Sequence, residues 1–141
     1  MIQISVLASQ RKVANVQFVT TALKLQRDVQ KWCLSQGRRN DNYGLTRLYQ
    51  TVESISVAVI TLNSIYANTI EGIKQRLNLM REAEQNLHVF NAQLTAMYPL
   101  FNIKHKRAKR WSDWSNTESK LLAGVRRADM KRLNKLQEAN Q

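Results

Sequence analysis

Two clusters of basic residues are the most informative local features of this sequence. The first cluster is a short basic run that ends in two tryptophans. Lys and Arg side chains bind phosphate groups, and the face of an indole ring stacks on an unpaired base, so the combination is typical of proteins that bind single-stranded or structured nucleic acid. The residues that we expect to make these contacts are Lys104, Lys106, Arg107, Lys109, Arg110, Trp111 and Trp114.

The local conformation of this run decides what its tryptophans can do. Residues 115–118, Ser-Asn-Thr-Glu, have the capping-box pattern that starts a helix, so the sequence predicts a basic loop at 102–114. In such a loop, one indole would anchor the run to the protein and the other would be free to stack on a base. The alternative interpretation is structural: at least one of Trp111 and Trp114 closes the end of a helical bundle or fills a subunit interface.

The second basic cluster lies near the C-terminus, and its members repeat at the spacing of a helix. Only one acidic residue, Asp129, stands among them, so the cluster could lay a charged helix face along a nucleic-acid backbone. The alternative is an ordinary solvated helix face. Arg38 and Arg39, in a predicted turn at 37–44, would extend the same positive field if that end of the fold lies nearby. The cluster comprises Arg126, Arg127, Lys131, Arg132 and Lys135.

The charge of the whole chain supports a polyanionic partner. The 141 residues include 22 Lys and Arg against 10 Asp and Glu, a net charge of +12. So large an excess repels itself in a compact protein, and a nucleic acid is the partner that we expect. An acidic protein surface and an anionic membrane surface are the alternatives. Because no helix-turn-helix, zinc finger or ribonucleoprotein motif is visible, we expect binding to the backbone with weak sequence specificity.

The residues needed for catalysis are scarce. The two histidines, His88 and His105, and the one cysteine, Cys33, cannot assemble a zinc site of the usual spacing, and the isolated glycines form no phosphate-binding loop. We expect Cys33 to be a buried thiol in a helix. The sequence therefore predicts no enzyme activity, no cofactor and no metal site. It also lacks a secretory signal pattern and an apolar run of about 18 residues, so we expect a cytoplasmic protein without a membrane segment.

The elements that must position these residues are helices. Gly and Pro number only 4 and 1, and apolar residues recur at spacings of three and four along most of the chain. The pattern predicts one all-α domain over 1–141, an antiparallel up-down four-helix bundle, in which Asn68 or Thr69 caps the third helix and Pro99 ends it. The expected helices cover 7–36, 45–67, 70–98 and 115–138.

Several segments of the chain resemble one known family of small four-helix bundles. They are residues 42–48 and 52–55, with a tyrosine-containing turn before an apolar helix, then 75–77, 87, 94 and 98–100, and finally 118–127. The family comprises proteins encoded in intervening sequences of ribosomal RNA genes and the accessory variability determinant, Avd, of diversity-generating retroelements. The resemblance implies a basic homopentamer that assists a reverse transcriptase and its template RNA. The alternative function is an oligomeric structural adaptor that scaffolds another protein through helix packing.

Overall fold

Four helices account for nearly all of the residues that the structure describes. The computed structural model describes residues 16–36 and 43–140, and these contain no strand. The prediction of an all-α four-helix bundle is confirmed. The helices are α2 (Gln17–Ser35), α3 (Tyr43–Ser64), α4 (Ile70–Leu100) and α5 (His105–Ala139).

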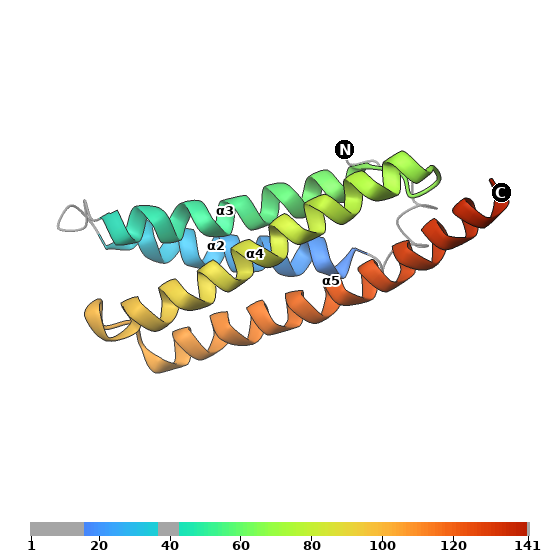
Figure 1. The fold of residues 1–141 in the computed structure, drawn as a ribbon. Helices are drawn as coiled ribbons and strands as arrows, with labels where there is room; N and C mark the ends of the chain where they lie inside the picture. Colours follow the sequence, from blue (N-terminus) through green and yellow to red (C-terminus); the bar gives the residue numbers. More distant parts are fainter. Residues whose placement is uncertain (1–15, 37–42, 141) are drawn as a thin grey trace.

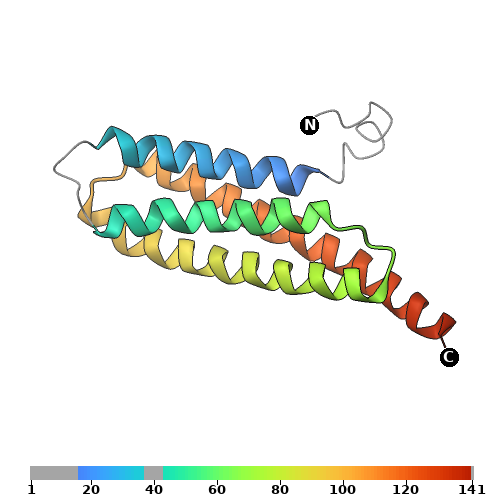
Figure 2. The ribbon, with the colours of Figure 1, turned by 90° about the horizontal axis from the view of Figure 1, so that it is seen from above.

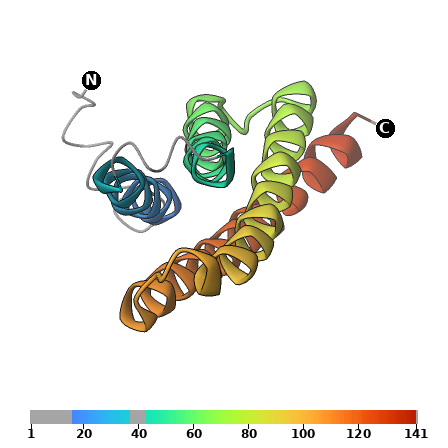
Figure 3. The same cartoon turned by 90° about the vertical axis from the view of Figure 1, so that its left-hand side faces the viewer.

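The helices follow one another around the bundle in chain order. Each packs against the next, and α5 closes the ring by packing against α2 (Figures 1 and 3). α5 runs obliquely, so its first half lies beside α2, whereas its last turns project past the ends of the other helices (Figure 2). The two halves of α5 therefore have different neighbours.

Helices α2, α3 and α4 bury most of the apolar stripes that their spacing predicts, whereas α5 fully buries only Leu122 and Leu133 of the apolar residues expected inside it. In α2 the buried residues recur at spacings of four and three, which places them on one side of the helix. The matching stripes of α3 and α4 are buried as well, except for Leu77 of α4, which is half-buried, and Tyr66, which lies beyond the end of α3 and is 79% exposed. The buried stripe of α2 is Phe18, Ala22, Leu25, Val29 and Trp32.

The start of the last helix is the main correction to the predicted fold. α5 begins at His105, ten residues before the predicted Ser115, so the expected basic loop at 102–114 is wrong. The link between α4 and α5 is only residues 101–104, and Asn102 turns the chain there with a left-handed φ of 52°. Ser115 does not cap a helix. It is buried inside α5, and its hydroxyl donates a hydrogen bond to Asn91 Oδ1 at 3.0 Å.

The continuity of α5 has a simple cause. Inward-facing residues recur at spacings of three and four on both sides of the capping-box pattern, so a single helix buries all of them. Burial of a complete indole outweighs the roughly 1 kcal/mol that a helix cap contributes. The stripe begins with Ala108, Trp111, Ser115, Glu118 and Leu122.

The other helix bounds differ from the predictions by smaller amounts. α3 begins two residues earlier and ends three residues earlier than the predicted 45–67. α4 begins at Ile70 as predicted, with the Thr69 hydroxyl accepting a hydrogen bond from the N–H of Gly72 at 2.9 Å, but it continues to Leu100. Pro99 therefore lies in its last turn instead of beyond its end. Residues 7–15 of the predicted first helix lie outside the described residues.

An ion pair between α4 and α5 fixes the C-terminal half of α5. Arg76 of α4 donates a hydrogen bond to Asp129 of α5 at 2.7 Å, and the Asp129 side chain is 0% exposed. The same guanidinium donates to the carbonyl oxygens of Leu62 and Ile65 at 2.9 and 2.8 Å, which satisfies acceptors at the end of α3. Arg132 completes the group by donating to the second oxygen of Asp129. One arginine thus joins three helices.

Candidate nucleic-acid interface

Net charge is divided unequally between the two halves of the bundle. On α3 and α4 the formal charges cancel, because four basic residues stand against four acidic ones. They are Arg47, Lys74, Arg76 and Arg81 against Glu53, Glu71, Glu82 and Glu84. The α3–α4 half therefore contributes nothing to the net charge of the chain.

The α2–α5 half carries the excess. α2 has Lys24, Arg27 and Lys31 against Asp28, and α5 has ten basic residues against four acidic ones. These two helices thus hold +8 of the total of +12. The basic residues of α5 are Lys106, Arg107, Lys109, Arg110, Lys120, Arg126, Arg127, Lys131, Arg132 and Lys135.

Six of the ten basic residues of α5 face away from the bundle. At 100° per residue they lie opposite the buried stripe, and all six are exposed. Among the described residues, only Lys109 of these six has an ion-pair partner, Asp113 at 2.9 Å, and both members of that pair are more than half exposed. An exposed pair of this kind contributes little and is screened by salt. We call these six residues the α5 outer stripe: Lys106, Lys109, Lys120, Arg127, Lys131 and Lys135.

In the first predicted cluster, some side chains face solvent and others form contacts within the bundle. Lys104, directly before α5, is exposed like Lys106 and Lys109 of the outer stripe. Arg110, in contrast, donates to Asp28 of α2 at 2.8 Å and lies over the ring of Trp114, 5.8 Å from its centroid. Its charge is therefore partly neutralised within the bundle.

The tryptophans are not a pair of stacking residues. Trp111 is 0% exposed and packs edge-on against Trp32 of α2, with ring centroids 5.6 Å apart. Its Nε1–H donates to Asp28 at 2.6 Å. The prediction that Trp111 contacts a base does not fit this position, because a helical Trp111 points into the core. Trp114 is half-buried against the core, with Arg110 over its ring.

Asp28 was not found from the sequence, although it organises this end of the interface. Burial alone would raise the pKa of Asp28, but hydrogen bonds from Trp111 and Arg110 and the charges of Arg110 and Arg107 hold it below the ordinary 3.8. Asp28 is therefore an anion at neutral pH. Its partners on α5 lie more than 80 residues away in sequence, so no local pattern could reveal them.

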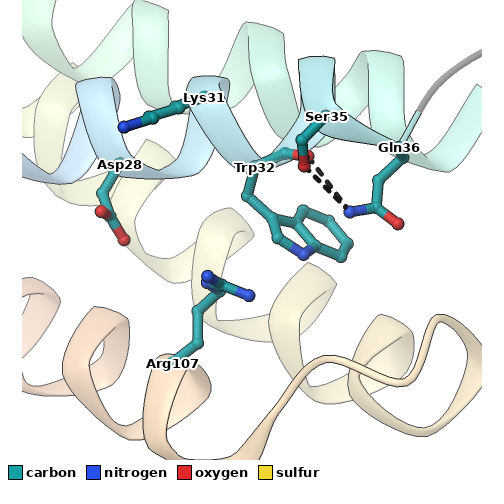
Figure 4. Close-up of a pocket in the computed structure, with 6 residues that line it drawn as sticks. All are labelled: Asp28, Lys31, Trp32, Ser35, Gln36 and Arg107. Carbon is teal, nitrogen blue, oxygen red and sulfur yellow. Dashed lines mark hydrogen bonds between the residues drawn. The ribbon is translucent and has the colours of Figure 1, made fainter.

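A pocket of about 310 Å³ opens between α2 and α5 beside these contacts. Figure 4 shows Arg107 extending from α5 toward the Trp32 ring, while Lys31 and Asp28 extend from α2. Two cations and one carboxylate thus border the pocket. The remaining lining residues are Ser35 and Gln36, which hydrogen-bond to one another and to the carbonyl of Trp32 at the end of α2.

The second predicted cluster likewise contains some residues that form ion pairs and others that face solvent. Arg126 forms an ion pair with Glu84 of α4, which attaches α5 to its neighbour, and Arg132 donates to the buried Asp129 within α5 itself. Arg127, Lys131 and Lys135 belong to the outer stripe and have no ion-pair partner among the described residues. Arg38 and Arg39 lie outside the described residues.

The groups that a catalytic or metal site would need are sparse in the described part of the chain. No three His, Cys, Asp or Glu side chains gather there in a way that could hold a metal ion. Burial raises the pKa of the Cys33 thiol to about 11, so Cys33 is protonated at neutral pH. No helix in residues 16–36 and 43–140 combines the length and the apolar character needed to cross a membrane.

The comparisons with known proteins add no relative. No protein-family model, curated protein or solved structure matches this chain. The resemblance to the Avd family consequently stays a prediction.

Basic residues that the sequence analysis missed also belong to the α2–α5 half. Lys24, Arg27 and Lys31 are exposed on α2, and Lys120 joins the two parts of the outer stripe. Their spacing gave a usable signal, because the three α2 residues recur at three and four, out of phase with the buried stripe. They were overlooked because they do not stand in a run of basic residues along the sequence.

Proposed function

We propose that this chain is a non-enzymatic protein that binds the phosphate backbone of nucleic acid through α2 and α5. The observation that carries the proposal is the unequal division of charge, in which α3 and α4 are neutral and α2 and α5 hold +8. Self-repulsion within one half of a bundle opposes folding, and a polyanion relieves it. An acidic residue on α5 that would reduce this field, Glu118, is buried, and burial raises its pKa to about 8.

Binding of this kind depends on charge and on little else. Long Lys and Arg side chains reach phosphates from a helix surface, and each contact releases condensed counterions. The affinity should therefore fall steeply with salt and should vary little with base sequence. RNA is our preferred partner, and this preference depends on the resemblance to the Avd family.

The proposal is tested with two double variants that remove equal charge from different halves. R127Q/K131Q removes one Arg and one Lys from the outer stripe, and K74Q/R81Q removes one of each from exposed positions on α4. On labelled RNA, the first should weaken binding about tenfold and lower the slope of log K against log salt by about 2, whereas the second should change both little. Equal losses would mean that binding follows net charge and has no defined surface.

The resemblance supplies a more specific form of the proposal. In that form the nucleic acid is a template RNA of a diversity-generating retroelement, and the chain assists its reverse transcriptase as a cytoplasmic homo-oligomer, a pentamer in the family. A reverse-transcriptase gene next to this one, and co-purification of the two proteins after nuclease treatment, would support it. Failure of the proteins to associate would remove the retroelement role and leave nucleic-acid binding standing.

A structural adaptor is the second candidate, and one surface favours it. α3 contains only two charged residues, Arg47 and Glu53, and it exposes Val57 and Ile60 by 58% and 46%. Such a face suits contact with another protein or another copy. Light scattering separates the candidates: self-association that survives nuclease treatment favours the adaptor, and a complex that nuclease dissolves favours the nucleic-acid binder.

A further inference from the structure

The length of α5 suggests which form of nucleic acid the outer stripe fits. α5 is one helix of 35 residues without a proline, about 52 Å long at 1.5 Å per residue. Lys106 and Lys109 lie near its start, and Arg127, Lys131 and Lys135 lie near its end. The centres of these two groups are separated by about 35 Å along one face of the helix.

This separation is fixed by contacts at both halves of the helix. Trp111 bonded to Asp28 holds the first half against α2, and Asp129 bonded to Arg76 holds the second half against α4. Both carboxylates belong to hydrogen-bonded groups that also include arginines. The two groups of cations therefore stand at a constant distance, and only their flexible side chains adjust.

B-form DNA presents phosphates at the same interval. Along any line parallel to the axis of B-form DNA, one strand returns after a turn of about 34–36 Å. Proteins that bind double-stranded RNA likewise contact successive grooves along one side of the duplex. The second strand crosses the same line once within each turn, and Lys120 lies in the interval between the two end groups.

The outer stripe lacks what a single strand requires. Proteins that bind single strands combine cations with aromatic rings on which successive bases stack. Between its cations, the outward side of α5 carries Asp113, Asn116 and Thr117, and no aromatic residue. Two tyrosines of the described residues are more than 70% exposed, but neither is on α5: Tyr43 begins α3 and Tyr66 lies in the turn after α3.

We infer that the ligand of the outer stripe is a double helix, either DNA or the stem of a structured RNA, whose successive turns are contacted by the two ends of α5. The inference depends on the proposed function and adds the form of the ligand to it. A duplex much shorter than one turn can contact only one end group at a time, so the advantage of binding both ends together disappears.

The test compares hairpins with stems of 6 and 16 base pairs and the same loop, made in RNA and in DNA, with an unpaired strand that carries as many phosphates as the long hairpin. The variants are K106Q/K109Q and R127Q/K131Q, one for each end of α5. On the long stem, each variant should bind about tenfold more weakly and lower the salt slope by about 2. On the short stem, each should change affinity less than about twofold, because the remaining end group still binds.

Each result decides between the two proposals. Length dependence with RNA stems, DNA stems or both supports the inference and identifies the helical form. Equal losses on short and long stems, or binding of the unpaired strand as tight as that of the long stem, would overturn the inference and leave the proposed function intact. Absence of salt-dependent binding to every probe would overturn the proposed function itself. Unchanged helical circular dichroism confirms that the variants fold.

Discussion

Both halves of the bundle bury apolar residues, but among the described helices only α5 also buries carboxylates, Glu118 and Asp129, and the two halves expose different charges. α3 and α4 are neutral, whereas α2 and α5 carry +8, although all four helices have apolar stripes at the same spacing. Packing therefore explains the inner faces of all four helices and leaves the charge of the outer faces free. The α2–α5 surface is costly for folding, which is why we interpret it as the binding surface.

A comparison within α5 sharpens this difference, because some of its charged groups maintain the fold and others face solvent. Asp129 is 0% exposed and accepts from Arg76 and Arg132, whereas Asp113 is 59% exposed and pairs with Lys109. Asp129→Ala should lower the free energy of unfolding by about 4 kcal/mol, because it leaves a nearly buried guanidinium unpaired. Asp113→Ala should cost less than about 1 kcal/mol. Urea unfolding measures both, and similar losses would contradict the distinction.

Glu118 should make stability depend on pH. It is 0% exposed, its carboxylate oxygens have no hydrogen-bond partner among the described residues, and burial raises its pKa from 4.5 to about 8. A raised pKa means that the folded protein holds the proton more tightly than the unfolded chain does. The contribution of Glu118 to stability should therefore be greatest below pH 4.5, and this contribution should be lost as the pH rises through 8.

The size of this effect is on the order of 3 kcal/mol between pH 5 and pH 8. Glu118→Gln cannot ionise, so the variant should gain stability relative to the native chain as the pH rises. Asp28 titrates below 3.8 and so does not contribute in this window. Thermal unfolding at several pH values measures the difference, and parallel profiles for the two proteins would show that Glu118 is ionised in the fold.

Replacement of either tryptophan should lower the free energy of unfolding and leave nucleic-acid affinity unchanged. Trp111→Leu should lower the free energy of unfolding by about 2–3 kcal/mol, because it leaves a cavity beside Trp32 and removes a donor from Asp28. Trp114→Leu, at a half-buried position, should cost about 1 kcal/mol. Neither should change nucleic-acid affinity at a temperature where the variant is folded. A Trp111 variant that keeps its stability and loses affinity would restore base stacking by that residue.

Removal of charge from the outer stripe should slightly raise the free energy of unfolding, and this is the smallest effect that we expect. In low salt, R127Q/K131Q should raise the free energy of unfolding by about 0.5 kcal/mol, because it reduces repulsion within the α2–α5 half. K74Q/R81Q should give no such gain, since its cations lie on the neutral half. The gain should vanish at high salt. A gain that persists at high salt would have another cause.

For the described residues, the sequence predicted the number and order of the helices and most of the buried faces of α2, α3 and α4, because an apolar stripe at spacings of three and four is a strong and repeated signal. It misplaced the start of α5 because the capping-box pattern at 115–118 is local, whereas the stripe that overrides it runs through Ala108 and Trp111. The same stripe, followed upstream from Leu122, would have extended the helix.

The sequence could not show which basic residues face solvent and which form ion pairs. Charge clusters identified α5, but they could not distinguish Arg126 and Arg132, which form ion pairs with Glu84 and Asp129, from the solvent-facing Arg127. That distinction depends on which side of a helix faces a neighbour. The role of Asp28 depends on the packing of α2 against α5, which only the folded chain brings together.

Lysine acetylation, with and without bound nucleic acid, reports the protection of each lysine of the native sequence and so tests whether binding occurs on the α2–α5 half. With RNA bound, mass spectrometry should show severalfold slower modification of Lys106, Lys109, Lys120 and Lys131 on α5. Lys74, exposed on α4, should react at the same rate with and without RNA. Equal protection of Lys74 and the α5 lysines, or no protection on α5, would contradict the assignment of binding to the α2–α5 half.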